Sequence, residues 1–136
     1  MNVLVIDAQG GGIGRQVVNS LKKRFPDIEI TAVGTNSAAT AAMLKAGADH
    51  GATGENPVVV CAKRADVIVG PIGMVIADAM YGEITPKMAL AIGQSPARRI
   101  LIPVNHCDNI IAGVTDYSLS RLVEQVVDLV GKEIEK

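Results

Sequence analysis

The sequence predicts an α/β fold in which helices cover both faces of a mostly parallel sheet of about five strands. Short β-branched runs alternate along the chain with segments whose apolar residues recur every three or four positions. Apolar residues make up 49% of the 136 residues and aromatic residues only 2%, as is typical of aliphatic strands buried on both faces. A chain of this length suits one core, so we expect a single domain over residues 1–136.

Five segments are expected to form the strands. The third has the weakest signal because glycine flanks it on both sides. The expected strands span Asn2 to Ile6, Glu29 to Val33, Asp49 to Ala52, Asp66 to Gly70 and Arg99 to Val104. Because helical segments separate them, we expect parallel neighbours joined by right-handed crossovers.

The segments between the strands carry helix start and stop signals. Pro26 ends the first helix, and Thr85 followed by Pro86 is a strong start for another helix. Residues 71–80 are expected to form a loop and a short helix. The other expected helices lie at about residues 13–25, 38–46, 56–65, 86–93 and 119–134, and the last is the most clearly amphipathic.

A glycine-rich turn follows the first expected strand. Residues Ile6 to Arg15, IDAQGGGIGR, hold four glycines within five positions. Between a strand and a helix, such a turn lets backbone N–H groups approach a phosphate, and the helix N-terminus adds partial positive charge. We therefore expect a nucleotide or another phosphate-bearing small molecule to bind there. The alternative is a turn that needs glycine only for a positive φ and for tight packing.

The spacing of Ala8, Gly12 and Gly14 resembles the glycine loop of short-chain dehydrogenases, G-x-x-x-G-x-G, with Ala8 in place of the first glycine. By that resemblance, Gly12 allows close approach to a pyrophosphate and Gly14 allows the helix to pack closely. The catalytic Tyr-x-x-x-Lys of that family does not occur in the sequence, so hydride transfer of its type is not expected. The carboxylate that normally binds a nucleotide ribose about twenty residues beyond the glycines is also missing, because residues 34–37, Gly-Thr-Asn-Ser, occupy that place. The sequence therefore does not decide whether the cofactor is NAD, NADP or another nucleotide.

Over its whole length, the chain resembles an uncharacterised family of bacterial proteins of about this size. The resemblance rests on the segments DAQGGGIGR, AVGTNSAATAAMLKAGADHGATGEN, GPIG, GEITP and IGQSPARRILIPVN. It implies a three-layer Rossmann-like domain, but it brings no activity, catalytic residue or substrate.

In open parallel sheets, ligands bind beyond the carboxyl ends of the strands, near the point where the strand order reverses. Asp7 is expected there to hold backbone N–H groups of the glycine loop, or to bind a ribose hydroxyl or a metal. Arg15 is expected either to neutralise a phosphate or to point into water. The candidate cofactor-binding residues are Asp7, Gly10, Gly11, Gly12, Ile13, Gly14, Arg15, Thr35, Asn36, Ser37, Pro71 and Gly73.

The candidate catalytic residues are His50, His106, Cys107 and Asp108. The two histidines are expected at the ligand-binding edge, where a group that titrates near neutrality can shuttle protons. Cys107 is a candidate nucleophile. Chance placement in polar loops is the simpler explanation, and no metal site is expected because no second His/Cys pair has metal-type spacing.

Charge and hydropathy argue against several classes of partner. A formal charge of −1 and a pI near 6.1 provide no dense cationic field for nucleic acid or an anionic membrane. No stretch approaches the ~20 apolar residues of a membrane span, and no basic leader precedes the first strand, so we expect a cytoplasmic protein with free thiols. The aliphatic content favours a homo-oligomer. The alternative to a ligand-binding protein is therefore a non-enzymatic structural or interaction protein that self-associates.

Overall fold

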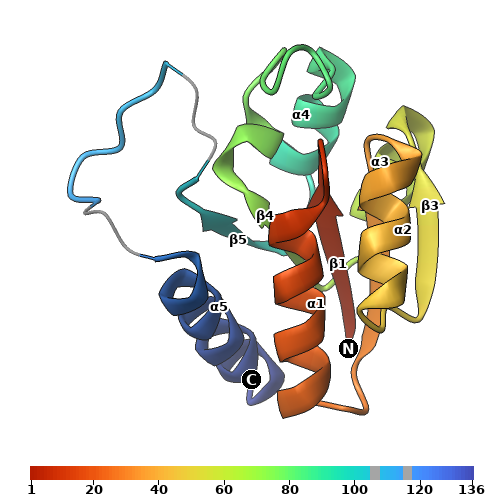
Figure 1. Ribbon diagram of the computed structural model, residues 1–136, viewed down its shortest axis with the longest axis vertical. Coiled ribbons are helices and arrows are strands. Elements are labelled where there is room, and N and C mark those ends of the chain that lie inside the picture. Colours follow the sequence, from red (N-terminus) through yellow and green to blue (C-terminus); the bar gives the residue numbers. More distant parts are fainter. Residues whose placement is uncertain (105–107, 115–117) are drawn as a thin grey trace.

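A computed structural model describes residues 1–104, 108–114 and 118–136 of the chain. Within these residues, five parallel strands form one sheet in the order β3-β2-β1-β4-β5 (Figure 1). The strands are β1 (Asn2–Asp7), β2 (Glu29–Gly34), β3 (His50–Thr53), β4 (Val67–Pro71) and β5 (Arg98–Ile102). The α/β class and all five expected strands are confirmed, including the short strand between glycines.

Helices cover both faces of this sheet. They are α1 (Gly12–Arg24), α2 (Ser37–Lys45), α3 (Glu55–Ala62), α4 (Pro86–Gly93), α5 (Leu119–Ile134) and the 3-10 helix η1 (Ile72–Val75). Figure 1 shows α1 between α2 and α5 in front of the strands. No helix of the described residues is both long enough and apolar enough to cross a membrane.

Two hydrophobic clusters separate the three layers. Side chains alternate between the faces of a strand, so Val3 and Val5 of β1 pack with α1, α2 and α5 in one cluster. Leu4 and Ile6 pack with α3, α4 and η1 in the other. Both faces of β1 are therefore buried, which explains its uninterrupted apolar sequence.

The strand order places a topological switch beside β1. The chain runs outward from β1 to β2 and β3, and it then crosses the sheet to β4, which pairs with the other side of β1. This parallel order is Rossmann-like. The loop after β1 and the η1 helix after β4 both begin at the carboxyl ends of the two strands that flank the switch, which is where ligands bind in such sheets.

The helices differ in whether the residue before the first turn caps the helix with its side chain. The side chain of Asn36 caps α2 by accepting a hydrogen bond from the Ala39 N–H at 2.9 Å. Thr85 caps α4 in the same way through the Met88 N–H at 3.1 Å. In contrast, α1 follows Gly11, which has a φ of 74° and provides no side-chain cap, and the first turn of α1 contains no acidic residue.

Three elements differ in extent from the sequence expectation. The helix α3, expected to reach about residue 65, ends at Ala62. The expected strand up to Val104 ends at Ile102, because Pro103 has no N–H to donate to a strand pair. The short helix expected within residues 71–80 is η1, and turns follow it, with positive φ values at Asp78, Met80 and Tyr81.

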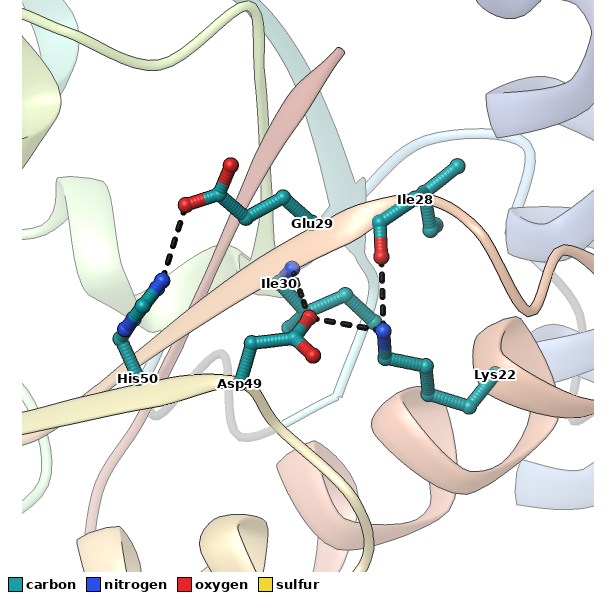
Figure 2. A network of polar contacts seen from close by, with 6 residues as sticks. All are labelled: Lys22, Ile28, Glu29, Ile30, Asp49 and His50. Atoms are coloured by element: carbon teal, nitrogen blue, oxygen red, sulfur yellow. Dashed lines mark hydrogen bonds and ion pairs between the residues drawn. The ribbon is translucent and has the colours of Figure 1, made fainter.

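A polar network joins α1 to the amino ends of β2 and β3 (Figure 2). The Lys22 Nζ donates to the Ile28 carbonyl at 2.7 Å and pairs with the Asp49 Oδ2 at 2.7 Å. The same Asp49 oxygen accepts the Ile30 N–H at 2.8 Å. The hydrogen bond from Lys22 and then that from Ile30 lower the pKa of Asp49 below its ordinary 3.8.

We expect Asp49→Asn to remove the attraction to Lys22 while the Asn oxygen still accepts the Ile30 N–H. The side chain of Asp49 is 38% exposed, so the free energy of unfolding should fall by less than about 1 kcal/mol at neutral pH. Because the folded-state pKa is lowered, this stabilisation is present above pH 3.8 and is lost as the pH falls through the lowered value. Urea unfolding from neutral pH to about pH 3 should therefore show the wild type and the variant converging. A difference in stability that does not change with pH would contradict the assignment.

Candidate functional site

The glycine loop connects the carboxyl end of β1 to the amino end of α1, and Asp7 holds it in place. Asp7 is the last residue of β1 and only 3% exposed. Its Oδ1 accepts the Ala8 N–H at 2.8 Å, and its Oδ2 accepts the Gly14 N–H at 2.6 Å. Of the roles considered for Asp7, the structure shows the first, which is to bind N–H groups of the loop.

The environment of Asp7 affects its charge in two opposing ways. Burial raises the pKa of Asp7, and the nearby Glu83 carboxylate adds to this effect. The N–H groups of Gly14, Ala8 and Ile13 act in the opposite direction, because hydrogen bonds favour the ionised carboxylate. The two oxygens of Asp7 therefore accept hydrogen bonds from backbone N–H groups at both ends of the loop.

Two glycines of the loop are required by the protein itself. Gly11 has a φ of 74°, and a Cβ there would lie 2.8 Å from the Cα of Ala39 in α2. A Cβ on Gly14 would lie 2.5 Å from the sulfur of Met43 and 3.0 Å from the Cβ of Asp7. Backbone conformation and close packing therefore explain glycine at these two positions.

The other two glycines have no such requirement. A Cβ on Gly10 or on Gly12 would meet no atom within 4 Å, and neither residue has a positive φ. Both residues are exposed. Open space therefore lies beside the backbone at these positions, and neither packing nor conformation explains why they lack a side chain.

The backbone N–H groups of these glycines also fall into two pairs, of which one pair is hydrogen-bonded within the protein and the other is not. The Gly11 N–H donates to the Ala8 carbonyl at 3.0 Å, and the Gly14 N–H donates to Asp7. Within the described part of the chain, the N–H groups of Gly10 and Gly12 have no acceptor. Two backbone donors near the positive end of α1 thus remain available to a ligand.

Glu83 joins this loop to the residues that follow β2, and sequence reasoning missed it. Its Oε1 accepts the Gln9 N–H at 2.9 Å, the Thr35 hydroxyl at 2.7 Å and the Asn36 side-chain amide at 2.9 Å. The Thr35 hydroxyl lowers the pKa of Glu83 most, and the hydrogen bonds from Gln9 and Asn36 lower it further. Glu83 lies within the GEITP segment, but no local pattern indicates a contact with residues 74 and 48 positions earlier.

The remaining cofactor-binding candidates occupy different positions around this edge. The Thr35 hydroxyl and the Asn36 amide are engaged by Glu83, whereas Ser37 is exposed at the start of α2. Arg15 is exposed, and its side chain has no partner within the described residues. Pro71 at the end of β4 and Gly73 in η1 are buried.

The expectation that His50 lies at this edge is wrong. His50 is the first residue of β3, and Thr53 is at the carboxyl end of that strand. The His50 Nε2 lies 2.9 Å from the Glu29 Oε1 at the start of β2, beside the Lys22 network (Figure 2). The two ends of even a short strand lie about 10 Å apart. A residue at the start of β3 is therefore on the opposite edge of the sheet from the glycine loop, as the expected strand bounds of Asp49 to Ala52 already implied.

The other catalytic candidates add no group to the described site. His106 and Cys107 lie outside the described residues, and Asp108 is exposed. Within residues 1–104, 108–114 and 118–136, no three His, Cys, Asp or Glu side chains are grouped as metal ligands would be.

Because Gly14 is closely packed and Gly12 is not, the same added methyl group should have different effects on stability at the two positions. Gly14→Ala should lower the free energy of unfolding by about 1–3 kcal/mol, because Asp7 and Met43 must move to admit the new Cβ. Gly12→Ala is the matched control, since it adds the same Cβ to open space and should change stability by no more than about 0.5 kcal/mol. Urea unfolding of both variants measures this difference. Equal losses would show that Gly12 is also a packing residue.

Comparisons with known proteins identify a family but no activity. The family described as "Domain of unknown function (DUF3842)" matches residues 2–135. No curated protein matches the chain.

Two solved structures show a remote likeness to this chain. Apo saccharopine dehydrogenase (L-Glu forming) from Saccharomyces cerevisiae is 14% identical with a TM-score of 0.48, and the match covers 88% of this chain but only 23% of the yeast enzyme. A dodecameric FMN-dependent UbiX-like decarboxylase from Escherichia coli O157:H7 is 13% identical with a TM-score of 0.47, and the match covers 96% of this chain and 95% of that one. Neither likeness carries an argument about ligand or assembly. The match over residues 2–135 shows that the chain belongs to the DUF3842 family.

Proposed function

We propose that the chain binds a nucleotide, or another phosphate-bearing small molecule, with the phosphate on the glycine loop. The observation that carries this proposal is the pair of N–H groups at Gly10 and Gly12. Both lack an acceptor within the described residues, and both belong to glycines beside which a side chain would meet nothing within 4 Å. Backbone donors that side chains do not obstruct are what a phosphate-binding loop requires.

The electrostatics of α1 support an anionic group at this end. The helix dipole gives its amino end a partial positive charge, and the first turn itself contains no acidic residue. The side chain of Arg15, in the same turn, is exposed and without a partner in the described structure. The Asp7 carboxyl accepts the Gly14 N–H of this turn, so it offsets part of the positive charge when it is ionised, and burial raises its pKa. The outward-facing N–H groups of Gly10 and Gly12 are not bonded to it.

A hollow at the other end of the molecule is a weaker candidate for an anion. It has a volume of about 370 Å³ and lies beside β5, where its lining includes four basic side chains and one acidic side chain. Two of these cations, Arg98 and Lys136, pair with Glu133 at 3.2 and 3.1 Å. Surface cations that already have an internal partner provide less attraction for a ligand.

The alternative is that the loop is a purely structural turn in a protein that self-associates. Gly11 and Gly14 fit that explanation completely, because φ and packing account for them. Gly10 and Gly12 do not fit it, since nothing in the described structure requires glycine there. The proposal concerns binding alone, and it assigns no reaction to the chain.

A thermal-shift experiment with Gly12→Val tests the proposal. In the wild type, we expect ADP, NAD⁺, FMN or inorganic pyrophosphate to raise the melting temperature by several degrees, because a ligand at 100 times its Kd stabilises the folded state by about 2.7 kcal/mol. In the variant, the branched side chain fills the space beside the free N–H groups, so this rise should disappear while the ligand-free melting temperature stays nearly the same.

Gly93→Val is the matched control. Gly93 also lies in a helix with open space beside it, but it is at the end of α4 that leads into β5. This variant should keep the full ligand-dependent rise. The proposal is overturned when no probe stabilises the wild type, or when Gly12→Val responds to the probes as the wild type does.

A further inference from the structure

We propose that Glu83 selects the sugar of the bound nucleotide, by accepting hydrogen bonds from free ribose hydroxyls and by excluding a 2′-phosphate. This inference rests on the proposed function, because it assigns a second contact to the ligand whose phosphate lies on the glycine loop. It concerns a specificity-determining residue that comes from a different part of the chain than either loop of the site.

The position of Glu83 is the first argument. The carboxylate bridges Gln9 of the glycine loop and Thr35, the first residue after β2. In Rossmann-like sheets, a nucleotide with its phosphate on the glycine loop has its ribose beside the end of the second strand. Here β2 ends in Gly34 and is followed by Thr35 and Asn36, so it has no carboxylate of its own at that place. The segment between η1 and α4 supplies one.

The distribution of hydrogen bonds on Glu83 is the second argument. Its three donors, Gln9, Thr35 and Asn36, all bind Oε1. Within the described residues, Oε2 has no donor. Glu83 is only partly buried, and hydrogen bonds lower its pKa, so it is ionised at neutral pH and acts only as an acceptor. A hydroxyl donor, such as those of a ribose diol, can satisfy this free carboxylate oxygen.

The same contacts disfavour a phosphate on the ribose. A 2′-phosphate beside Oε2 would bring two anions together, and no Lys or Arg pairs with Glu83 in the described structure. The Thr35 hydroxyl and the Asn36 amide already donate to Glu83, so they are not free to bind that phosphate. The chain should therefore prefer a nucleotide with an unmodified ribose.

A merely structural role is the competing explanation, since Glu83 also ties the two loops together. Glu83→Gln separates the two roles. The Gln oxygen can still accept from Gln9, Thr35 and Asn36, while an uncharged amide group replaces Oε2. If Glu83 is only a structural link, this variant should lose some stability but leave the sugar preference unchanged.

The test is isothermal titration calorimetry of the wild type and Glu83→Gln with four probes, which are ADP, 2′-deoxy-ADP, NAD⁺ and NADP⁺. For the wild type we expect ADP to bind roughly tenfold to hundredfold more tightly than 2′-deoxy-ADP, as for one hydrogen bond to a charged group, and NAD⁺ to exceed NADP⁺ by a similar factor. In Glu83→Gln, the preference for NAD⁺ over NADP⁺ should fall by about tenfold or more, because the repulsive charge is gone.

Glu133→Gln is the matched control. Glu133 is also a hydrogen-bonded carboxylate with a lowered pKa, but it lies in α5 and contacts Arg98 at the amino end of β5. Its replacement should leave the sugar preference unchanged, as the proposal requires.

Three outcomes overturn the inference, and they separate it from the proposed function. Wild-type protein that binds ADP and 2′-deoxy-ADP equally, and NAD⁺ and NADP⁺ equally, has no sugar selection, although phosphate binding stands. A preference that persists unchanged in Glu83→Gln belongs to another residue. If the protein binds pyrophosphate but no nucleotide, the proposed phosphate site stands and the proposed contact to the sugar is wrong. The wild-type titrations test the sugar preference even if Glu83→Gln fails to fold.

Discussion

The buried carboxylate of Asp7 is the constraint on which the rest of the site depends. A carboxylate that is 3% exposed must be compensated by donors, because an unpaired buried charge is costly. The Ala8 and Gly14 N–H groups provide this compensation from the two sides of the loop. They fix the carboxyl end of β1 to the first turn of α1, where the side chains of Asp7 and Met43 leave no room for a Cβ on Gly14. Gly10 and Gly12 lie in the chain between these two bonded residues.

Two carboxylates near the loop have pKa values that are shifted in opposite directions, and the difference follows from their surroundings. Asp7 is buried, and desolvation outweighs its hydrogen bonds and raises its pKa. Glu83 is only partly buried, and hydrogen bonds from Thr35, Gln9 and Asn36 lower its pKa. Around the free N–H groups, the site therefore combines the positive end of α1 with a negative group beside the end of β2. Such an arrangement suits a ligand that is anionic at one end and presents hydroxyl donors at the other.

Most of the fold was predictable from the sequence because its signals are local. The apolar run of β1, the cap at Asn36 and the Thr85–Pro86 helix start each act within a few residues. The glycine loop belongs to the same class, since a strand, four glycines and a helix follow one another directly. The family match over residues 2–135 is consistent with the whole-chain resemblance. The strand, the helix caps and the glycine loop depend on backbone conformation and on periodicity, and short segments of sequence are enough to encode both.

The parts of the site that sequence reasoning missed depend on distant contacts or on strand ends. Glu83 lies 74 residues from Gln9, and only the folded sheet brings the two together. The error at His50 was to assign the residue to the carboxyl edge of the sheet, although the expected strand, Asp49 to Ala52, already had it as the second residue and β3 begins at His50. Glycine patterns alone also do not distinguish Gly14, which packing requires, from Gly12, which has open space beside it. That distinction depends on Met43, a side chain from another helix.

The segment that carries Glu83 shows how the core can determine the position of a surface group. Asp78, Met80 and Tyr81 all have positive φ values, which cost of order 1 kcal/mol or more each and persist only when neighbouring contacts hold them. Those contacts are present. The Asp78 N–H donates to the Ile84 carbonyl at 2.8 Å, and the side chains of Met80 and Ile84 are buried in the cluster beneath α4.

Tyr81, which lies between the buried residues Met80 and Ile84, is fully exposed. The hydrophobic core therefore holds the segment at Met80 and Ile84 rather than at its tip. Glu83 directly precedes Ile84 and is therefore anchored on one side by a core residue and on the other by hydrogen bonds to two loops. A carboxylate held in this way loses little further conformational freedom when a ligand binds, which is the condition under which one acceptor contributes fully to specificity.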